Sequence, residues 1–144
     1  MLNTAFRVVN DRDAAEDILQ ESFISAFRNL SLYRAESGFG AWMKRIVLNR
    51  SISWLRQQRT VPIGDEDYPE PAISEDETFP FTPEQVRKAI LLLPDGYRTV
   101  LSLYLLEGYD HEEIGQILGI TESTSKSQYS RAKMKLITIL KSGI

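Results

Sequence analysis

The sequence contains no cysteine and a single histidine in its 144 residues. The lack of cysteine excludes a disulfide scaffold and thiolate metal sites, and it fits a reducing compartment. Neither a His-x-x-x-His spacing nor a phosphate-binding G-x-x-x-x-G-K-S/T loop is present. We therefore expect no enzymatic activity, no catalytic residue, no metal site and no cofactor. His111 is interpreted as an ordinary first residue of a helix.

Long apolar runs are also missing, because every apolar stretch is interrupted within a few residues. No segment is long enough to span a bilayer, and none has the pattern of a secretory signal. These absences predict a soluble protein of the cytoplasm.

The net charge of −3 is unevenly distributed along the chain. Segment 61–83 holds seven acidic residues, five prolines and no basic residue, whereas 1–60 holds nine basic and six acidic residues and 84–144 holds eight and seven. Such a stretch is typical of a flexible linker. We predict an all-α protein in which an acidic flexible linker joins two small helical domains, 1–60 and 84–144. The linker either only solubilises the chain or also competes with nucleic acid for basic faces.

The C-terminal domain carries the turn and cap signals of a helix-turn-helix. Asp110 and Glu113 have the spacing of a capping box, which predicts a helix that starts at His111. Gly119 predicts the end of that helix, and Thr121 offers a hydroxyl cap for a second helix directly after it. A glycine inside a helix costs about 1 kcal/mol against alanine, so Gly115 is expected where the two helices cross closely.

The second helix of this motif separates into two faces. At helical spacing, the inward side chains are Ser125, Tyr129, Ala132, Leu136 and Ile139, and the outward ones are Ser123, Lys126, Ser127, Ser130 and Arg131. No acidic residue follows Glu122, so the basic residues can meet phosphates unopposed. A solvated basic helix is the alternative for the charges alone, but the complete motif favours duplex DNA in the major groove.

The N-terminal domain is predicted to begin a helix at Asp13, which forms a second D-x-x-E start with Glu16. The apolar stripe expected for this helix is Leu19, Phe23, Ala26, Phe27 and Leu30. A second, longer helix is expected from about Phe39 to Gln58, with a packing side of Trp42, Met43, Ile46 and Val47. Its basic residues and aromatic rings suit a single nucleic-acid strand. Trp42 fits the core better than base stacking, and Trp54 is open to either role.

Two runs carry a resemblance to a known family. The run DAAEDILQESFISAFRNLSLYRAESGFGAWMKRIVLNRSISWLRQQR and the later LPDGYRTVLSLYLLEGYDHEEIGQILGITESTSKSQYSRAK resemble, in order, the two domains of bacterial extracytoplasmic-function sigma factors. The resemblance implies a non-catalytic specificity subunit of RNA polymerase. Its N-terminal domain would bind the β′ clamp coiled coil and melt the minus-10 element. Its C-terminal domain would bind the β flap and read the minus-35 element, and an anti-sigma factor is an expected partner beside promoter DNA.

Other classes of protein explain less of the sequence. A free-standing helix-turn-helix regulator without polymerase contact would want a receiver or ligand domain with strands, and no strand pattern precedes the linker. A pure protein-interaction module, held by an inhibitor and never touching DNA, is partly compatible with the sigma-factor interpretation.

The resemblance also implies site residues. The polymerase-binding set is Asp13, Glu16, Asp17, Gln20 and Glu21, for which a merely solvated face is the alternative. The minus-10 set is Tyr33, Arg34, Ser37, Phe39, Lys44, Arg45, Asn49 and Ser53, and the minus-35 set is Ser123, Thr124, Lys126, Ser127, Gln128 and Arg131. Asn49 is either a base-contacting amide or a buried, satisfied one, and Ser53 replaces a longer family residue. Gln128 could pair with adenine.

The family usually has another helix ahead of this sequence, so the resemblance places Met1 inside the second helix of the domain. We therefore expect a shortened N-terminal domain. Losing a helix from a small bundle removes packing area, which predicts exposed apolar surface around Phe6, Val8 and Val9.

Overall fold

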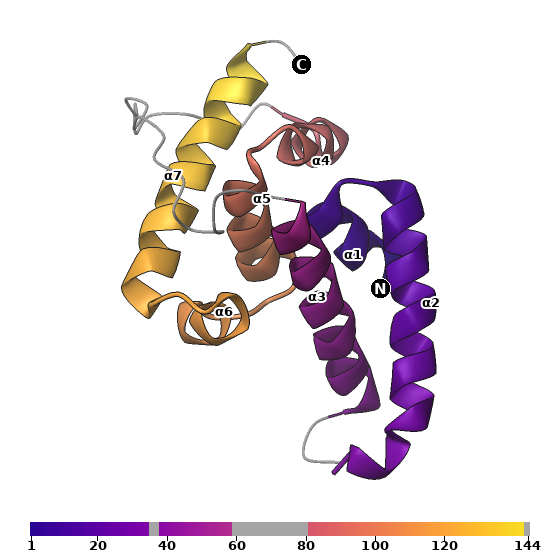
Figure 1. Cartoon of the computed structure of the whole chain (residues 1–144). Coiled ribbons are helices and arrows are strands. Elements are labelled where there is room, and N and C mark those ends of the chain that lie inside the picture. Colours follow the sequence, from indigo (N-terminus) through magenta and orange to yellow (C-terminus); the bar gives the residue numbers. More distant parts are fainter. Residues whose placement is uncertain (35–37, 59–80, 143–144) are drawn as a thin grey trace. The chain divides into compact units, whose positions relative to one another are not determined.

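A computed structural model describes residues 1–34, 38–58 and 81–142, and every regular element in these ranges is helical. The chain divides into two compact units, Met1–Thr60 and Val61–Ile144 (Figure 1). The predicted all-α fold is confirmed, whereas 61–80 of the linker expected over 61–83 lies outside the described residues. Within the described ranges, no helix has the length and apolar character needed to cross a membrane.

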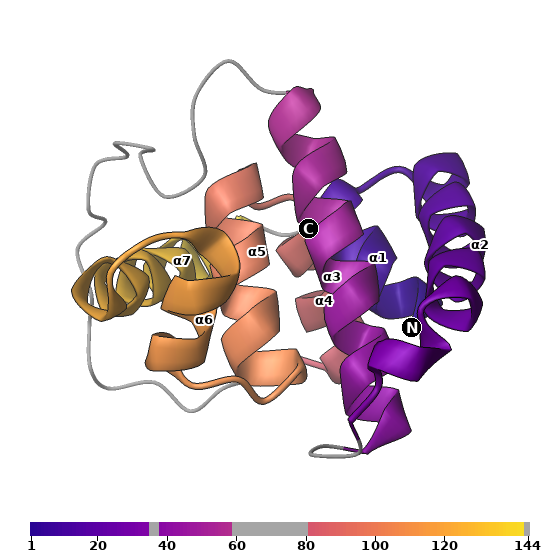
Figure 2. The ribbon, with the colours of Figure 1, turned by 60° about the horizontal axis from the view of Figure 1, so that its bottom comes forward.

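The N-terminal unit is a bundle of three helices. They are α1 (Leu2–Val9), α2 (Arg12–Arg28) and α3 (Phe39–Gln57), and a short 3-10 turn, η1 (Leu30–Leu32), follows α2. Helix α1 packs against both α2 and α3, and those two also pack against each other (Figures 1 and 2). The long helix predicted from Phe39 is confirmed.

Helix α2 begins earlier than its sequence suggested. Asp11 is the N-cap, in extended backbone conformation, and its Oδ1 accepts a hydrogen bond of 3.0 Å from the Ala14 N–H. Asp13 already lies in the first turn, so the predicted start at Asp13 is wrong. Two acids two residues apart compete for the cap, and the one that follows the left-handed Asn10 takes it.

The predicted apolar stripe of α2 is also wrong for its larger members. The buried residues of α2 are Ala15, Ile18, Ser22 and Ala26. Phe23 is 40% exposed and Phe27 70%, and Leu30 beyond the helix end is exposed as well. Three of the four buried side chains are small, so the face of α2 that packs against α1 and α3 is not its most apolar one.

The remaining packing faces of this unit differ from expectation in two respects. The buried face of α3 is Met43, Val47, Leu48, Ser51, Ile52 and Leu55, so Met43 and Val47 are confirmed, while Trp42 and Ile46 are only partly buried. The apolar exposure expected in α1 is not found, because Val8 and Val9 are buried and Phe6 is partly buried.

The C-terminal unit consists of α4 (Pro83–Leu91), α5 (Asp95–Leu101), the π-helical turn η2 (Ser102–Leu106), α6 (His111–Leu118) and α7 (Glu122–Lys141). Helix α7 packs against α4, α5 and α6. The main core cluster is Ala89, Ile90, Leu93, Tyr97, Leu101, Ala132, Leu136 and Leu140. Phe81 packs against this cluster, and Thr82 caps α4 in a capping box with Gln85. Phe81 and Thr82 were assigned to the linker by sequence, but both contact the folded unit.

The helix-turn-helix signals are confirmed in detail. Asp110 Oδ1 accepts a hydrogen bond of 2.8 Å from the Glu113 N–H, and Glu113 Oε1 accepts one of 3.2 Å from the Asp110 N–H. Gly119 ends α6 in the left-handed conformation, with φ of 70°. Thr121 Oγ1 then accepts a hydrogen bond of 3.0 Å from the Thr124 N–H and caps α7.

Gly115 marks a close crossing of α6 with the turn into α7, as predicted. A Cβ atom at this position would lie 2.6 Å from the Ile120 carbonyl oxygen and 3.5 Å from the Glu122 nitrogen. Both atoms belong to the backbone, so neither can swing away as the end of a side chain could. The turn therefore has its present shape only with glycine at this position.

We predict that Gly115→Ala destabilises the C-terminal unit by about 1–3 kcal/mol, because the backbone must shift to admit a methyl group. Chemical denaturation followed by circular dichroism measures the loss. Gly40→Ala is the matched control: Gly40 also lies in a helix, but its added Cβ would meet nothing within 4 Å. An equal effect of the two substitutions would show that Gly115 is not sterically required.

Candidate nucleic-acid interface

The outward face of α7 is polar and accessible. Ser123, Lys126, Ser127 and Ser130 are exposed, and Thr124 and Arg131 are partly buried. Lys126 Nζ lies 3.5 Å from Glu122 Oε1, and both side chains are more than half exposed. A pair this exposed contributes little stability, so Lys126 can exchange Glu122 for a phosphate at small cost.

Gln128 does not share that face, so the expectation that it contacts a base is not supported by its position. Its side chain is 2% exposed and lies one helical turn from Ala132, on the buried stripe with Ser125. The family resemblance placed Gln128 among the DNA-contacting residues, but it lies on the inward stripe. Of the six minus-35 candidates, the structure therefore keeps five at or near the surface.

The start of α7 adds its own positive end to this face. Thr121 satisfies the Thr124 N–H, and the helix dipole leaves partial positive charge at the first turn. Ser123 and Thr124 lie in that turn, which is the part of a helix suited to binding an anion such as phosphate.

His111 has contacts that its sequence position did not reveal. Its Nδ1 lies 2.8 Å from Oγ of the fully buried Ser125, so the first residue of α6 is tied to α7. Its ring is stacked on Tyr104 of η2, with centroids 4.4 Å apart, and Tyr129 of α7 lies 4.5 Å from Tyr104. Lys133 Nζ lies 5.4 Å from the Tyr129 ring centre. These contacts join three elements and leave no signal in the sequence around His111.

A second aromatic group lies in the N-terminal unit where single-strand contacts were predicted. The Tyr33 ring centre is 5.8 Å from that of Phe39 and 5.2 Å from that of Trp42, and the Phe39 and Trp42 centres are 5.7 Å apart. Phe39 is exposed, whereas Tyr33 and Trp42 are partly buried. Trp42 therefore supports the loop rings instead of joining the central core. Ser37, the other candidate of this loop, lies outside the described residues.

The remaining candidates for this single-strand site lie on α3 and beside the loop. Asn49 and Ser53 are exposed, which excludes the alternative of a buried Asn49. Arg34 is exposed, and Lys44 and Arg45 are partly buried along the same helix. The positive charges of Lys44 and Arg45 lie on the helix that carries Trp42, and such charges beside aromatic rings suit a nucleic-acid strand.

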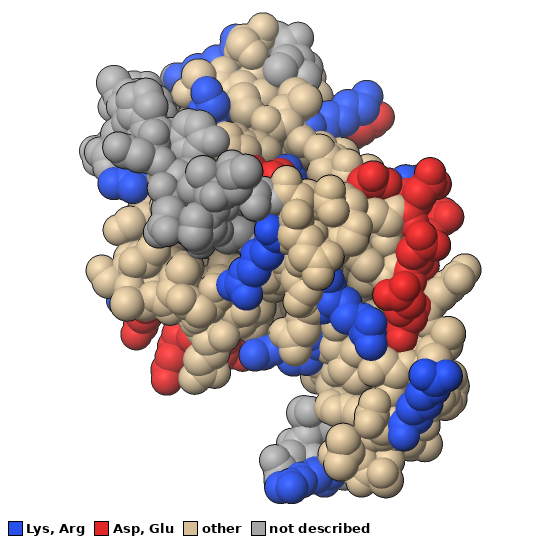
Figure 3. All heavy atoms as spheres, in the orientation of Figure 1, with Lys and Arg blue, Asp and Glu red and all other residues tan. Residues whose placement is uncertain are grey.

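The five acidic and amide candidates of α2 form one exposed face. They are Asp13, Glu16, Asp17, Gln20 and Glu21. The acidic side chains gather along α2 at the upper right of Figure 3. Arg12 Nε lies 3.7 Å from Glu16, and an Arg50 nitrogen lies 3.5 Å from Glu21. The pairs are exposed and weak, so the face keeps a net negative charge for a basic partner.

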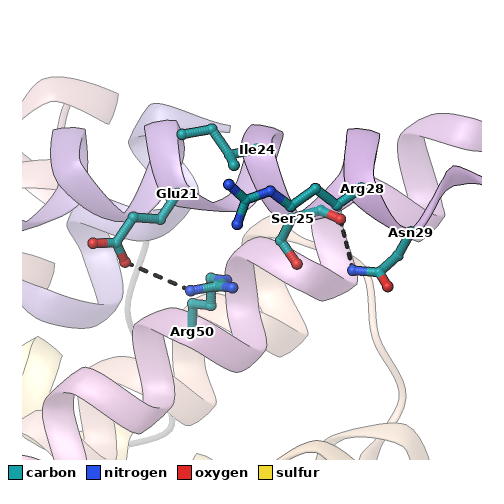
Figure 4. Close-up of a pocket in the computed structure, with 6 residues that line it drawn as sticks. All are labelled: Glu21, Ile24, Ser25, Arg28, Asn29 and Arg50. Carbon is teal, nitrogen blue, oxygen red and sulfur yellow. Dashed lines mark hydrogen bonds and ion pairs between the residues drawn. The ribbon is translucent and has the colours of Figure 1, made fainter.

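An open groove continues from this face toward the end of α2 (Figure 4). Its volume is about 420 Å³, and it is lined by Glu21, Ile24, Ser25, Arg28, Asn29 and Arg50. Asn29 donates a hydrogen bond of 2.8 Å to the Ser25 carbonyl oxygen. Arg28 extends back along α2 toward Ile24 in Figure 4. Phe27 lies on the same helix directly before Arg28 and is exposed, so this end of α2 offers an apolar side chain beside charged ones.

Over the described residues, the fold is all-helical, with two compact units and a helix-turn-helix in the second. Two family models match the chain: Sigma-70 region 2 over residues 1–61, and Sigma-70, region 4 over residues 83–136. Both regions are found in the order that the sequence suggested.

Curated relatives agree with the family models. The ECF RNA polymerase sigma-E factor of Haemophilus influenzae is 31% identical, and the match covers 85% of this chain and 72% of the relative. The chain belongs to the ECF sigma factors of the sigma-70 family. The probable RNA polymerase sigma factor RfaY of Xanthomonas campestris is 27% identical over 90% of the chain, which spans only 34% of that protein.

A solved structure shows the same fold. It is the sigma factor RpoE in complex with the anti-sigma factor NepR from Bartonella quintana, with a TM-score of 0.67 and 24% identity. The match covers 99% of this chain and 91% of the solved one.

We predict that Thr121→Ala lowers the free energy of unfolding by about 1 kcal/mol, because the Thr124 N–H loses its cap. The same variant should bind duplex DNA less tightly, since fraying of the first turn of α7 disorders Ser123 and Thr124. Thermal unfolding and fluorescence anisotropy measure the two effects. Thr138→Ala, in the last turn of α7 and far from its N-cap, is the control, and weaker DNA binding by that variant as well would argue against a specific role of the cap.

Proposed function

We propose that this protein is a sigma factor that directs RNA polymerase core to specific promoters. The observation that carries the proposal is the exposed, acid-poor face of α7, capped at Thr121 and held by a complete helix-turn-helix. In this role, the C-terminal domain reads the minus-35 element through Ser123, Thr124, Lys126, Ser127 and Arg131. Side chains near the start of α7 contact base edges. The backbone N–H groups of its first turn and its basic side chains contact phosphates.

The N-terminal domain opens the promoter in this proposal. A base leaving the stack costs a few kcal/mol, which a pocket with aromatic and polar groups can return. Tyr33, Phe39 and Trp42 supply the rings, and exposed Asn49 supplies an amide for a base edge. Arg34, Lys44 and Arg45 would track the phosphates of the captured strand.

The polymerase contacts fall on other surfaces. The acidic face of α2 is the proposed contact of the β′ clamp coiled coil, and the C-terminal domain is the proposed contact of the β flap. The negative charge of the α2 face supports its proposed contact with the clamp, because an acidic face suits a basic partner helix and repels duplex DNA. An anti-sigma factor is a further proposed partner. The protein would act in the cytoplasm, and the polymerase would carry out all of the chemistry.

The domain limits proposed for these roles are 1–60 and 84–144, with 61–83 as an acidic linker. Residues 61–80 include seven acidic residues, and this composition supports the assignment of a linker that DNA repels. Phe81, Thr82 and Pro83 are better counted with the second domain, where they pack and cap α4.

The proposal is tested by pull-down of purified core RNA polymerase with this chain, followed by run-off transcription from a pool of promoter fragments. Binding with promoter-dependent transcripts supports the proposal. Binding without transcripts would place the fault in promoter melting by the N-terminal domain. DNA binding without polymerase binding would instead support a free-standing helix-turn-helix regulator.

We predict that Lys126→Ala weakens duplex binding and reduces the slope of log affinity against log salt by about 0.9, the value for one lost phosphate contact. Anisotropy titrations at several salt concentrations measure the slope. Lys88→Ala is the matched control, since Lys88 is also an exposed lysine in an i,i+4 pair but lies on α4. An unchanged slope for Lys126→Ala would mean that Lys126 does not meet DNA.

We predict that the double charge reversal Asp17→Lys and Glu21→Lys weakens association with core polymerase by at least about tenfold, because it replaces attraction to a basic helix by repulsion. Pull-down at fixed salt measures this loss. The same variant should bind duplex DNA as the wild type does, because α7 is unchanged. Loss of both activities, with an altered circular dichroism spectrum, would indicate misfolding.

A further inference from the structure

His111 occupies the junction of three elements beside the proposed reading face. Its ring centre is 4.4 Å from Tyr104 on η2 and 5.6 Å from Tyr129 on α7, and its Nδ1 is 2.8 Å from Ser125 Oγ. Ser125 is fully buried and directly precedes Lys126 in α7. The imidazole therefore holds the same turns of α7 that present side chains to DNA.

The charges around His111 come from two helices. Lys126 and Glu122 act on it from α7, and Asp110 acts from the cap of its own helix. Tyr104 and Tyr129 present phenol rings, and burial raises the pKa of Tyr129 above its usual value. Burial, followed by the Lys126 charge, lowers the pKa of His111 below 6.5, and Glu122 and Asp110 oppose this only in part. The free chain therefore favours the neutral imidazole.

We propose that His111 is a positioning residue of the recognition helix and that its protonation is coupled to duplex binding. The inference rests on the proposed function, in which α7 reads DNA. A phosphate that pairs with Lys126 also brings negative charge to the vicinity of the imidazole, because Lys126 directly follows Ser125, whose Oγ lies 2.8 Å from the ring. The phosphate offsets the repulsion between the two cations, so the DNA-bound state favours the imidazolium.

Protonation does not remove the contact that positions α7. A neutral ring can accept a hydrogen bond from the Ser125 hydroxyl or donate one to it, and an imidazolium donates through Nδ1 to the hydroxyl oxygen. The stacked phenol rings also accept a cation at their faces. The helix keeps its place while the charge on its DNA side increases.

The direction of the pH effect follows from linkage. The pKa of His111 is higher in the bound state than in the free state, so binding takes up a proton. Affinity for the duplex rises as the pH falls through the bound-state pKa, and it becomes constant below the free-state pKa. A difference of one pKa unit corresponds to an affinity change of about tenfold.

Nuclear magnetic resonance measures this coupling directly, because His111 is the only histidine of the chain and its ring signals cannot overlap with others of their kind. The full chain is titrated alone and with a short duplex that it selects from a randomised pool. We expect the pKa of His111 to rise by about half a unit to one unit on binding. A pKa that stays constant or falls would overturn the inference.

Variants separate the charge from the contact. With His111→Gln, which cannot be protonated, we expect the dissociation constant to lose its dependence on pH between about pH 8 and about pH 5.5. With Ser125→Ala, we expect about three- to tenfold weaker binding at every pH, with the dependence retained, because only the positioning hydrogen bond is lost.

Glu112→Gln is the matched control, since it changes an exposed neighbouring side chain and should leave the pH profile intact. A wild-type pH profile in His111→Gln would overturn the inference while leaving the DNA-reading role in place. A chain that selects no duplex from the pool would overturn the proposed DNA reading and the inference with it.

Discussion

The close approach of α6 to the turn into α7 is the constraint on which the C-terminal unit depends. The Ile120 carbonyl oxygen occupies the space that a side chain at Gly115 would need. This contact sets the angle between the two helices, and the caps at Asp110 and Thr121 only fix where each helix starts. The His111 contact with Ser125 depends on the same angle, because it joins the first residue of one helix to the second turn of the other.

The two units present opposite charges to their proposed partners. Helix α2 exposes an acidic face, whereas α7 has no acidic residue after Glu122. A protein with a net charge of −3 can thus approach DNA with one helix and a basic protein surface with another. The arrangement lets the distribution of charge, rather than its sum, determine which partner meets which surface.

Sequence reasoning was most successful where structure is decided locally. The capping box at Asp110, the stop at Gly119 and the cap at Thr121 depend on residues within one turn, so their spacing is sufficient. It failed for the packing face of α2, where Ser22 is buried and Phe27 is exposed, because tertiary contacts decide which side of a helix meets its neighbours. The burial of Gln128 and the stacking of His111 on Tyr104 also depend on contacts between elements, which spacing along one helix cannot show.

The division of α2 into a core face of small residues and a solvent face with Phe23 and Phe27 separates folding from recognition within one helix. A substitution at Phe27 alters what the outside of the helix can hold but leaves the contacts with α1 and α3 as they are. The reverse applies at Ala15 or Ala26, where a larger side chain would disturb the bundle without changing the outer surface. Partner preference in this unit can therefore diverge between duplicated copies of the protein without loss of a folded bundle.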